Sequence, residues 1–111
     1  MVKNKIIETI KNLLEERKDV LTKIEELPKG YIQKKTVSGH VYAFRQWREG
    51  NTVKSVYVNE NFVALTERKI QLRKSYSKLL KDINAEIKTL GKQAIKSGVL
   101  TQSEFDELVN C

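Results

Sequence analysis

Apolar side chains recur every three or four residues over the first 27 positions, the spacing of a helix that buries one face. We predict a helix over residues 1–27 that ends before Pro28, because proline lacks a backbone N–H and disfavours helical geometry at the preceding residue. One polar side chain, Arg17, interrupts the apolar stripe. We interpret it as a basic side chain that extends along a helix seam to solvent, with register fixing or partner contact as the alternative. The stripe consists of Ile6, Ile10, Leu13, Arg17, Val20, Ile24 and Leu27.

The period changes over residues 28–60, where β-branched and aromatic residues are frequent. We predict three strands, over residues 31–37, 40–48 and 52–58. The dipeptides Ser38-Gly39 and Gly50-Asn51 separate them, and both suit two-residue turns of antiparallel hairpins. The segment is therefore predicted to form a three-stranded meander.

The helical period returns over residues 61–98, with Gly91 as a weak point and Gly98 as the predicted end. A short helix is predicted over residues 101–110, because Thr101 and Glu104 have the spacing of a capping box. The stripe of the longer helix consists of Leu65, Leu72, Tyr76, Leu79, Ile83, Ile87, Leu90 and Ala94.

Together these elements predict an α+β fold in a single domain of residues 1–111. Two long antiparallel helices form a coiled-coil-like hairpin, the three-stranded antiparallel β-meander is inserted between them, and a short C-terminal helix follows. The sheet either lies at the tip of the hairpin or folds back over the helices. Because the second long helix has more apolar stripe than the first can cover, we also predict a homodimer through the long helices.

The composition favours a folded protein of the reducing cytoplasm. Of the 111 residues, 40% are hydrophobic and 32% charged, too apolar a chain for intrinsic disorder. We expect no membrane-spanning helix and no signal peptide. The single cysteine, Cys111, cannot form an internal disulfide, and we expect no catalytic role for it.

Residues suited to catalysis are scarce. The chain has one histidine, its carboxylates are scattered, and it contains no phosphate-binding loop, nucleophile elbow or calcium loop. We therefore expect a protein that is not an enzyme and that uses neither a metal nor a cofactor.

Positive charge is concentrated in the middle of the chain. The net charge is +7, and residues 28–60 carry six basic against two acidic side chains. Six more basic residues lie between positions 68 and 81 without an acidic one among them. This pattern favours a polyanionic partner, although lysine-rich helices can also be basic merely because they are well solvated. The predicted nucleic-acid or partner-binding residues are Lys29, Lys34, Lys35, Tyr42, Arg45, Arg48, Lys54, Tyr57, Arg68, Lys69, Arg73 and Lys74.

With two-residue turns, the meander has two distinct faces. The first, which we call the aromatic face, mixes aromatic, basic and amide groups that can stack on bases and reach phosphates. The competing interpretation, which the sequence favours because a one-residue slip would exchange the faces, is that these aromatics are the buried side. The second, the aliphatic face, has a small apolar centre suited to packing on helices. The aromatic face comprises Tyr31, Gln33, Lys35, Val37, His40, Tyr42, Phe44, Gln46, Arg48, Val53, Ser55 and Tyr57. The aliphatic face comprises Ile32, Lys34, Thr36, Val41, Ala43, Arg45, Trp47, Lys54, Val56 and Val58.

Several segments resemble known sequences. LPKGYI (27–32), GHVY (39–42), WREG (47–50) and KSVYV (54–58) resemble a family of small uncharacterised prokaryotic and phage proteins, which implies the helix–meander–helix fold and no assigned activity. The meander is loosely similar to the arm-type DNA-binding domains of phage integrases, which place such a sheet against DNA. Residues 95–108 resemble a short C-terminal helical motif of bacterial proteins that often serves in docking or oligomerisation.

Charge and resemblance lead to one hypothesis and one alternative. The first is a non-enzymatic nucleic-acid-binding accessory protein of a prokaryote or mobile element. The second is a protein–protein interaction module, such as a small phage inhibitor or adaptor, that meets an acidic surface of a host nucleic-acid enzyme.

Overall fold

The computed structural model describes residues 2–110 and confirms the predicted α+β fold, with every element in the predicted order. The first helix ends two residues before Pro28, and a short 3₁₀ turn precedes the second long helix. The elements are α1 (Val2–Glu26), β1 (Tyr31–Val37), β2 (His40–Glu49), β3 (Thr52–Val58), η1 (Glu60–Phe62), α2 (Val63–Lys96) and α3 (Gln102–Val109).

These elements divide into two compact units. One contains residues 2–22 and 77–110, which are most of α1, the second half of α2 and α3. The other contains residues 23–76, which are the end of α1, the sheet, η1 and the first half of α2. We call them the helical unit and the sheet unit.

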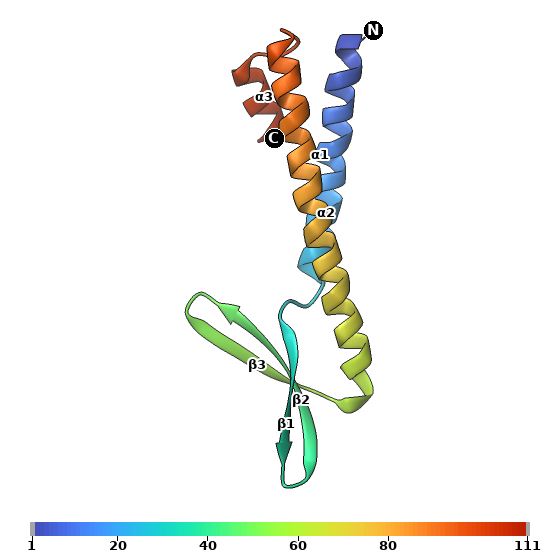
Figure 1. Cartoon of the computed structure of the whole chain (residues 1–111), viewed down its shortest axis with the longest axis vertical. Helices are drawn as coiled ribbons and strands as arrows, with labels where there is room; N and C mark the ends of the chain where they lie inside the picture. The colour runs from blue at the N-terminus through green and yellow to red at the C-terminus, as the bar shows by residue number, and fades with distance from the viewer. Residues whose placement is uncertain (1, 111) are drawn as a thin grey trace. The chain divides into compact units, whose positions relative to one another are not determined.

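In the helical unit, α1 and the second half of α2 lie side by side and antiparallel (Figure 1). Their facing stripes bury Ile10 and Val20 of α1 and Ile83, Ile87 and Ala94 of α2, all at most 4% exposed. Burial of each of these isoleucine and valine side chains contributes about 1.5–3 kcal/mol. The predicted helix pairing therefore has its core in this unit.

The buried face of α2 differs from the predicted one between Leu65 and Leu79. Leu65, Leu72 and Leu79 are exposed to 40%, 46% and 37%, so the prediction that they face the first helix is wrong. The buried face instead begins at Ile70, which is 3% exposed, and continues through the half-buried Arg73. A polar residue on the buried side is the reason that apolar spacing alone selected the wrong leucines.

The short helix α3 packs onto the helical unit through Phe105. A Cβ atom on Gly91 would lie 2.3 Å from the Phe105 ring, so the missing side chain of Gly91 makes room for that ring. Gly91 is thus a packing position inside α2. The predicted capping box is confirmed, because Thr101 Oγ1 accepts from the Glu104 N–H while the Glu104 carboxylate accepts from the Thr101 N–H.

The helix also ends near Gly98 as predicted. The amide of Val99 donates to the carbonyl of Ala94, and that of Gly98 donates to Ile95, the two bonds of a Schellman motif. The chain then passes directly into the N-cap of α3.

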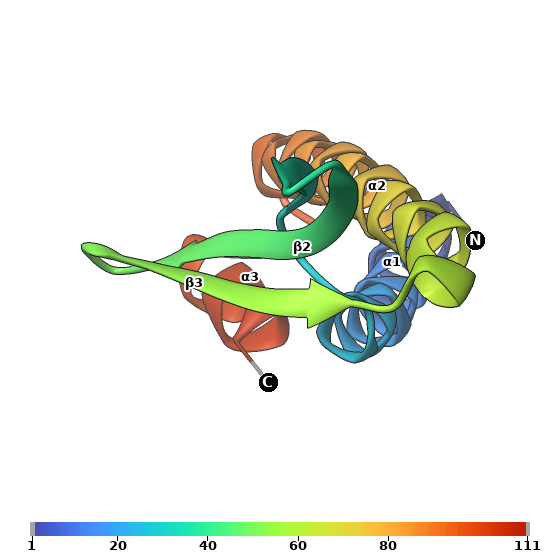
Figure 2. The same cartoon turned by 90° about the horizontal axis from the view of Figure 1, so that it is seen from below.

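The three strands form one antiparallel sheet in the order β1-β2-β3. Figure 2 shows β2 and β3 side by side. Val37 pairs with His40 and Glu49 with Thr52, so both hairpins have the predicted two-residue turns. Ser38 and Gly39 both have positive φ, as the first turn requires. The register confirms the predicted division of the sheet into an aromatic and an aliphatic face.

Two contacts fix how the chain enters the sheet. Arg73 donates hydrogen bonds to the carbonyl oxygens of Ile24 and Leu27, at 2.8 and 2.6 Å, and so caps the end of α1, where the Ile24 oxygen also accepts from the Leu27 N–H. Gly30, at φ +103°, lies against the backbone of β2, where a Cβ would meet the Gln46 carbonyl oxygen at 1.9 Å. Only glycine fits there, which explains the LPKG entry to β1.

Candidate nucleic-acid interface

The aromatic rings of the sheet form one connected group on the aromatic face. Tyr57 of β3 lies 6.3 Å from Tyr42 and 5.9 Å from Phe44, measured between ring centroids, and His40 lies 6.0 Å from Tyr42. These separations are typical of tilted and edge-to-face aromatic pairs. The four rings come from two neighbouring strands, because residues two apart in a strand point to the same side.

This face is largely open to solvent. Tyr31, Tyr42 and Tyr57 are exposed to 53%, 37% and 54%, and Phe44 is half-buried. The interpretation that the aromatics form the buried side of the sheet is therefore wrong. Among the residues of this face only Gln46 is buried, and its side-chain oxygen accepts a hydrogen bond from the Tyr31 hydroxyl. The rings themselves remain open to solvent.

The charged groups of the aromatic face are all basic. Lys35 extends over the Phe44 ring, with its Nζ atom 5.3 Å from the centroid, and Arg48 lies exposed two positions beyond Gln46 on β2. No aspartate or glutamate belongs to this face, because Glu49, which carries the one carboxylate of the three strands, points to the opposite side. The face thus offers exposed rings and positive charge without a competing negative group.

The aliphatic face is built differently. Ala43 is buried and Ile32 and Val58 are half-buried, as predicted for an apolar centre, whereas Val41 and Val56 are exposed. The predicted packing of this face against helices is therefore correct only for the part nearest to the strand ends that join α1 and α2.

Beside the connection between α1 and β1, three side chains of β2 on the aliphatic side of the sheet form a chain of contacts. The Arg45 guanidinium lies 4.0 Å from the centroid of the Trp47 ring and donates a 2.8 Å hydrogen bond to the Lys29 carbonyl. The Trp47 indole N–H donates to the Glu49 carboxylate at 3.0 Å. This hydrogen bond, helped by the positive charges of Lys29 and Lys54, lowers the pKa of the Glu49 carboxyl.

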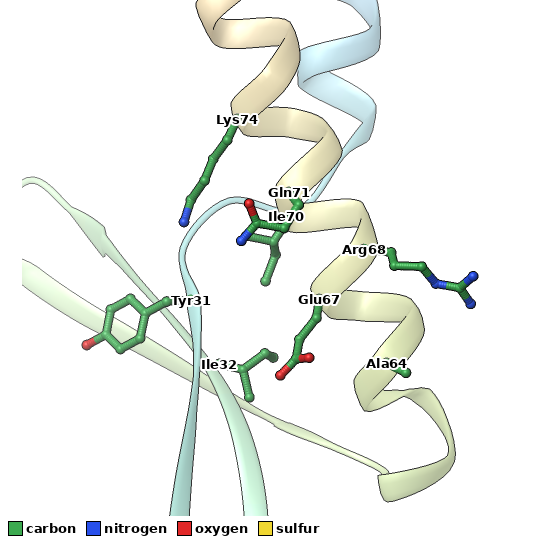
Figure 3. A pocket seen from close by; sticks show the side chains of 8 residues that line it. All are labelled: Tyr31, Ile32, Ala64, Glu67, Arg68, Ile70, Gln71 and Lys74. Atoms are coloured by element: carbon green, nitrogen blue, oxygen red, sulfur yellow. The ribbon is translucent and has the colours of Figure 1, made fainter.

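A pocket of about 550 Å³ lies between β1 and the first half of α2 (Figure 3). Ile32 and Ile70 supply its apolar part, and Glu67 points toward Ile32. Lys74 points toward the start of β1, whereas Arg68 points away from the strands. The pocket is lined by Tyr31, Ile32, Ala64, Glu67, Arg68, Ile70, Gln71 and Lys74.

The predicted binding residues therefore fall into separate groups. Lys35, Tyr42, Arg48 and Tyr57 share the aromatic face, while Lys34 and Lys54 are exposed on the aliphatic face. Lys29, Arg68, Lys69 and Lys74 are exposed outside the sheet. Arg45 and Arg73 are half-buried and held by backbone carbonyls, so their guanidinium groups serve the fold.

Sequence reasoning missed Tyr31 and Lys74 as neighbours. It placed His40 on the aromatic face but did not count it among the binding residues. His40 lies two positions before Tyr42 on the same face, and its ring contacts that of Tyr42. Lys74 could not be found from the strand register, because its direction depends on how α2 packs beside β1.

Residues 2–110 offer neither a metal site nor a membrane span. Within that range no three His, Cys, Asp or Glu side chains are grouped so that they could hold a metal ion. None of the described helices combines the length and apolarity needed to cross a membrane. Cys111, for which we expect no catalytic role, lies outside the described residues.

Fold and surface together define a small α+β protein with a three-stranded meander that exposes an aromatic, basic face. The chain belongs to the family described as Domain of unknown function (DUF6788), whose model matches residues 7–69. The matched segment includes most of α1, all three strands and the first turns of α2. The expected membership of an uncharacterised family is confirmed. No curated protein and no solved structure matches the chain.

Proposed function

We propose that this protein binds nucleic acid through the aromatic face of its meander and acts without catalysis. The observation that carries the proposal is the joint exposure of tyrosines and cations on a sheet face that has no carboxylate. Phosphates bind to lysine and arginine, and bases stack on aromatic rings. The chain's net charge of +7 adds a long-range attraction for polyanions. That it is an accessory protein of a prokaryote or a mobile element stays a prediction.

The structure allows a matched pair of charge reversals to test the proposal. Lys35→Glu with Arg48→Glu alters two exposed cations of the aromatic face, and Lys34→Glu with Lys54→Glu alters two exposed cations of the aliphatic face. Both double variants change the net charge equally, and all four positions lie in strands of the same sheet. Binding of the full chain to labelled random-sequence oligonucleotides is measured by fluorescence anisotropy across a salt series.

We expect parent binding to weaken steeply with salt, and the aromatic-face variant to lose most of its affinity. Removal of one cation that binds a phosphate lowers the log–log salt slope by about 0.7 for single strands and 0.9 for duplex. The aliphatic-face variant should keep most of the parent's affinity. Equal losses in both variants would show that net charge, and not this face, drives binding.

A second candidate is a protein–protein interaction module. The observation in its favour is the exposure of Phe62 to 57%, Leu65 to 40% and Leu72 to 46%, next to the basic residues Arg68 and Lys69. An apolar strip bordered by positive charge suits an acidic amphipathic segment of a partner protein. Absence of nucleic-acid binding even at low salt would put this candidate first. The predicted homodimer stays a prediction, which sedimentation at micromolar concentration tests.

A further inference from the structure

We infer that the aromatic face takes single-stranded nucleic acid, with unpaired bases stacked on its tyrosines, and discriminates against duplex. The inference rests on the proposed function, and it specifies the class of nucleic acid and the type of contact. Its basis is the exposure and arrangement of the rings, whereas the proposed function depends mainly on charge.

The exposed rings are close enough to act as one platform. Tyr42 and Tyr57 lie on adjacent strands with centroids 6.3 Å apart, and His40 and Phe44 extend the group along β2. Tyr57 is 54% exposed even though it contacts two other rings. A contiguous exposed aromatic patch of this kind marks a binding surface more often than a structural need.

Rings on a sheet surface suit single strands for a geometric reason. Bases in a duplex are already stacked on each other, so a tyrosine that stands on a sheet cannot reach their faces. Unpaired bases can turn outward and stack, as they do on sheet-based RNA-binding modules, where aromatic side chains hold about two or three bases. The three exposed tyrosines provide a comparable number of positions.

The distribution of charge agrees with this geometry. The aromatic face carries two cations, Lys35 beside the rings and Arg48 further along β2. Lys74, which points toward the start of β1 near Tyr31, adds a third at the edge of the sheet. Duplex affinity comes mainly from many phosphate contacts, so a surface rich in rings and limited in cations favours strands that can also stack.

The polar side chains near the rings do not form a base-reading set. Gln46 is buried, and its amide oxygen accepts from the Tyr31 hydroxyl. Gln33 and Ser55 are exposed, but they lie on β1 and β3 with β2 between them, so they do not form one cluster. We therefore expect binding that tolerates different sequences, because every base has a face on which a ring can stack.

The experiment compares the full chain's affinity for oligodeoxythymidylate, oligouridylate and a hairpin duplex of equal nucleotide number. Tyr42→Leu and Tyr57→Leu remove the rings, Tyr42→Phe and Tyr57→Phe keep them, and Val41→Ala on the aliphatic face is the control. Loss of a stacked base should weaken single-strand binding roughly 5- to 150-fold, because stacking contributes about 1–3 kcal/mol per base. The phenylalanine variants and Val41→Ala should bind as the parent does. Duplex affinity should be the weaker one and should not depend on the rings.

Tyr57→Trp supplies a readout that does not require loss of a ring. Its fluorescence should change when a single strand binds, whereas Trp47, on the opposite face, should report no change in the parent protein. This variant also guards against leucine variants that fail to fold, which thermal melting identifies.

The outcomes separate the two proposals. Tighter binding of either single strand, dependent on the rings, supports the inference, and a difference between the two strands tells DNA from RNA. Duplex binding as tight as single-strand binding, or folded leucine variants that bind as the parent does, overturns the inference. In that case the salt dependence and the Lys35/Arg48 variant decide the proposed function independently. If no oligonucleotide binds at low salt, both proposals fall.

Discussion

The guanidinium of Arg17 donates a 2.8 Å hydrogen bond to the backbone carbonyl of Val109, which joins the middle of α1 to the end of α3. Arg17 is half-buried, so neither solvent exposure nor a partner contact is needed to explain this polar side chain in an apolar stripe. The bond satisfies a carbonyl at the C-terminus of a helix, where positive charge is favourable. The prediction that Arg17 extends along the seam to solvent is therefore wrong. Its guanidinium instead anchors the end of α3 to α1.

We expect Arg17→Met to destabilise the protein by about 1–3 kcal/mol, because it keeps the aliphatic stem but leaves the Val109 carbonyl without its charged donor. Urea unfolding followed by circular dichroism measures the change. Arg68→Met, at an exposed position of α2, is the matched control and should change the free energy of unfolding by less than about 0.5 kcal/mol. Equal effects in the two variants would contradict the anchoring role.

The contact between Gly91 and Phe105 predicts a substitution whose effect changes sign with its background. Gly91→Ala should destabilise the parent by roughly 1–3 kcal/mol, because the added Cβ would overlap the Phe105 ring. In a Phe105→Ala background the clash is gone, and alanine should then stabilise α2 by up to about 1 kcal/mol through its better helix propensity. A double-mutant cycle by urea unfolding measures both. If the two substitutions are additive, Gly91→Ala has the same effect with and without the Phe105 ring, and the predicted clash with the ring costs nothing.

The sequence predicted the sheet far better than the buried face of α2. The alternation of the strands and the dipeptides Ser38-Gly39 and Gly50-Asn51 fix the register, because a two-residue turn leaves one pairing. In α2, the residue that follows Ile70 on the buried side is Arg73, and its guanidinium caps the end of α1. Side-chain polarity gives no sign of such a role, since it depends on where another helix ends.

The candidate site, too, was predictable only in part. Alternation placed Tyr42 and Tyr57 together, but whether that face is buried depends on what packs against it, which a single strand pattern does not encode. Arg45 counted as a binding cation by charge alone. Its contacts with Trp47 and the Lys29 carbonyl depend on the turn between α1 and β1, which positions that carbonyl.

The revised face of α2 changes what alanine substitutions should do. Ile83 is 3% exposed, so Ile83→Ala should cost about 2–5 kcal/mol through reduced burial and the cavity left behind. Leu79 is 37% exposed, and Leu79→Ala should cost less than about 1 kcal/mol. Both sites lie on one helix, so propensity effects are similar and the difference reports burial. Equal costs would restore Leu79 to the helix interface.

The hydrogen bond from Trp47 to Glu49 predicts a pH-dependent signal at low pH. This bond is the main cause of the lowered pKa of the Glu49 carboxyl, and the nearby positive charges of Lys29 and Lys54 act in the same direction. A lowered pKa means that the folded protein favours the ionised carboxylate. The resulting contribution to stability is present above the ordinary glutamate pKa and is lost as pH falls through the lowered value.

Trp47 is the single tryptophan of the chain, so tryptophan emission reports the surroundings of this one indole. We expect the emission to titrate with a midpoint below the ordinary glutamate value of 4.5, because protonation of Glu49 removes the charged acceptor of the indole N–H. Glu49→Gln is the matched control. Its amide oxygen still accepts the bond but does not titrate, so the transition should disappear while the sheet remains folded by circular dichroism. A midpoint at or above 4.5, or a transition that persists in Glu49→Gln, would assign the signal to another carboxyl and remove this contact as its cause.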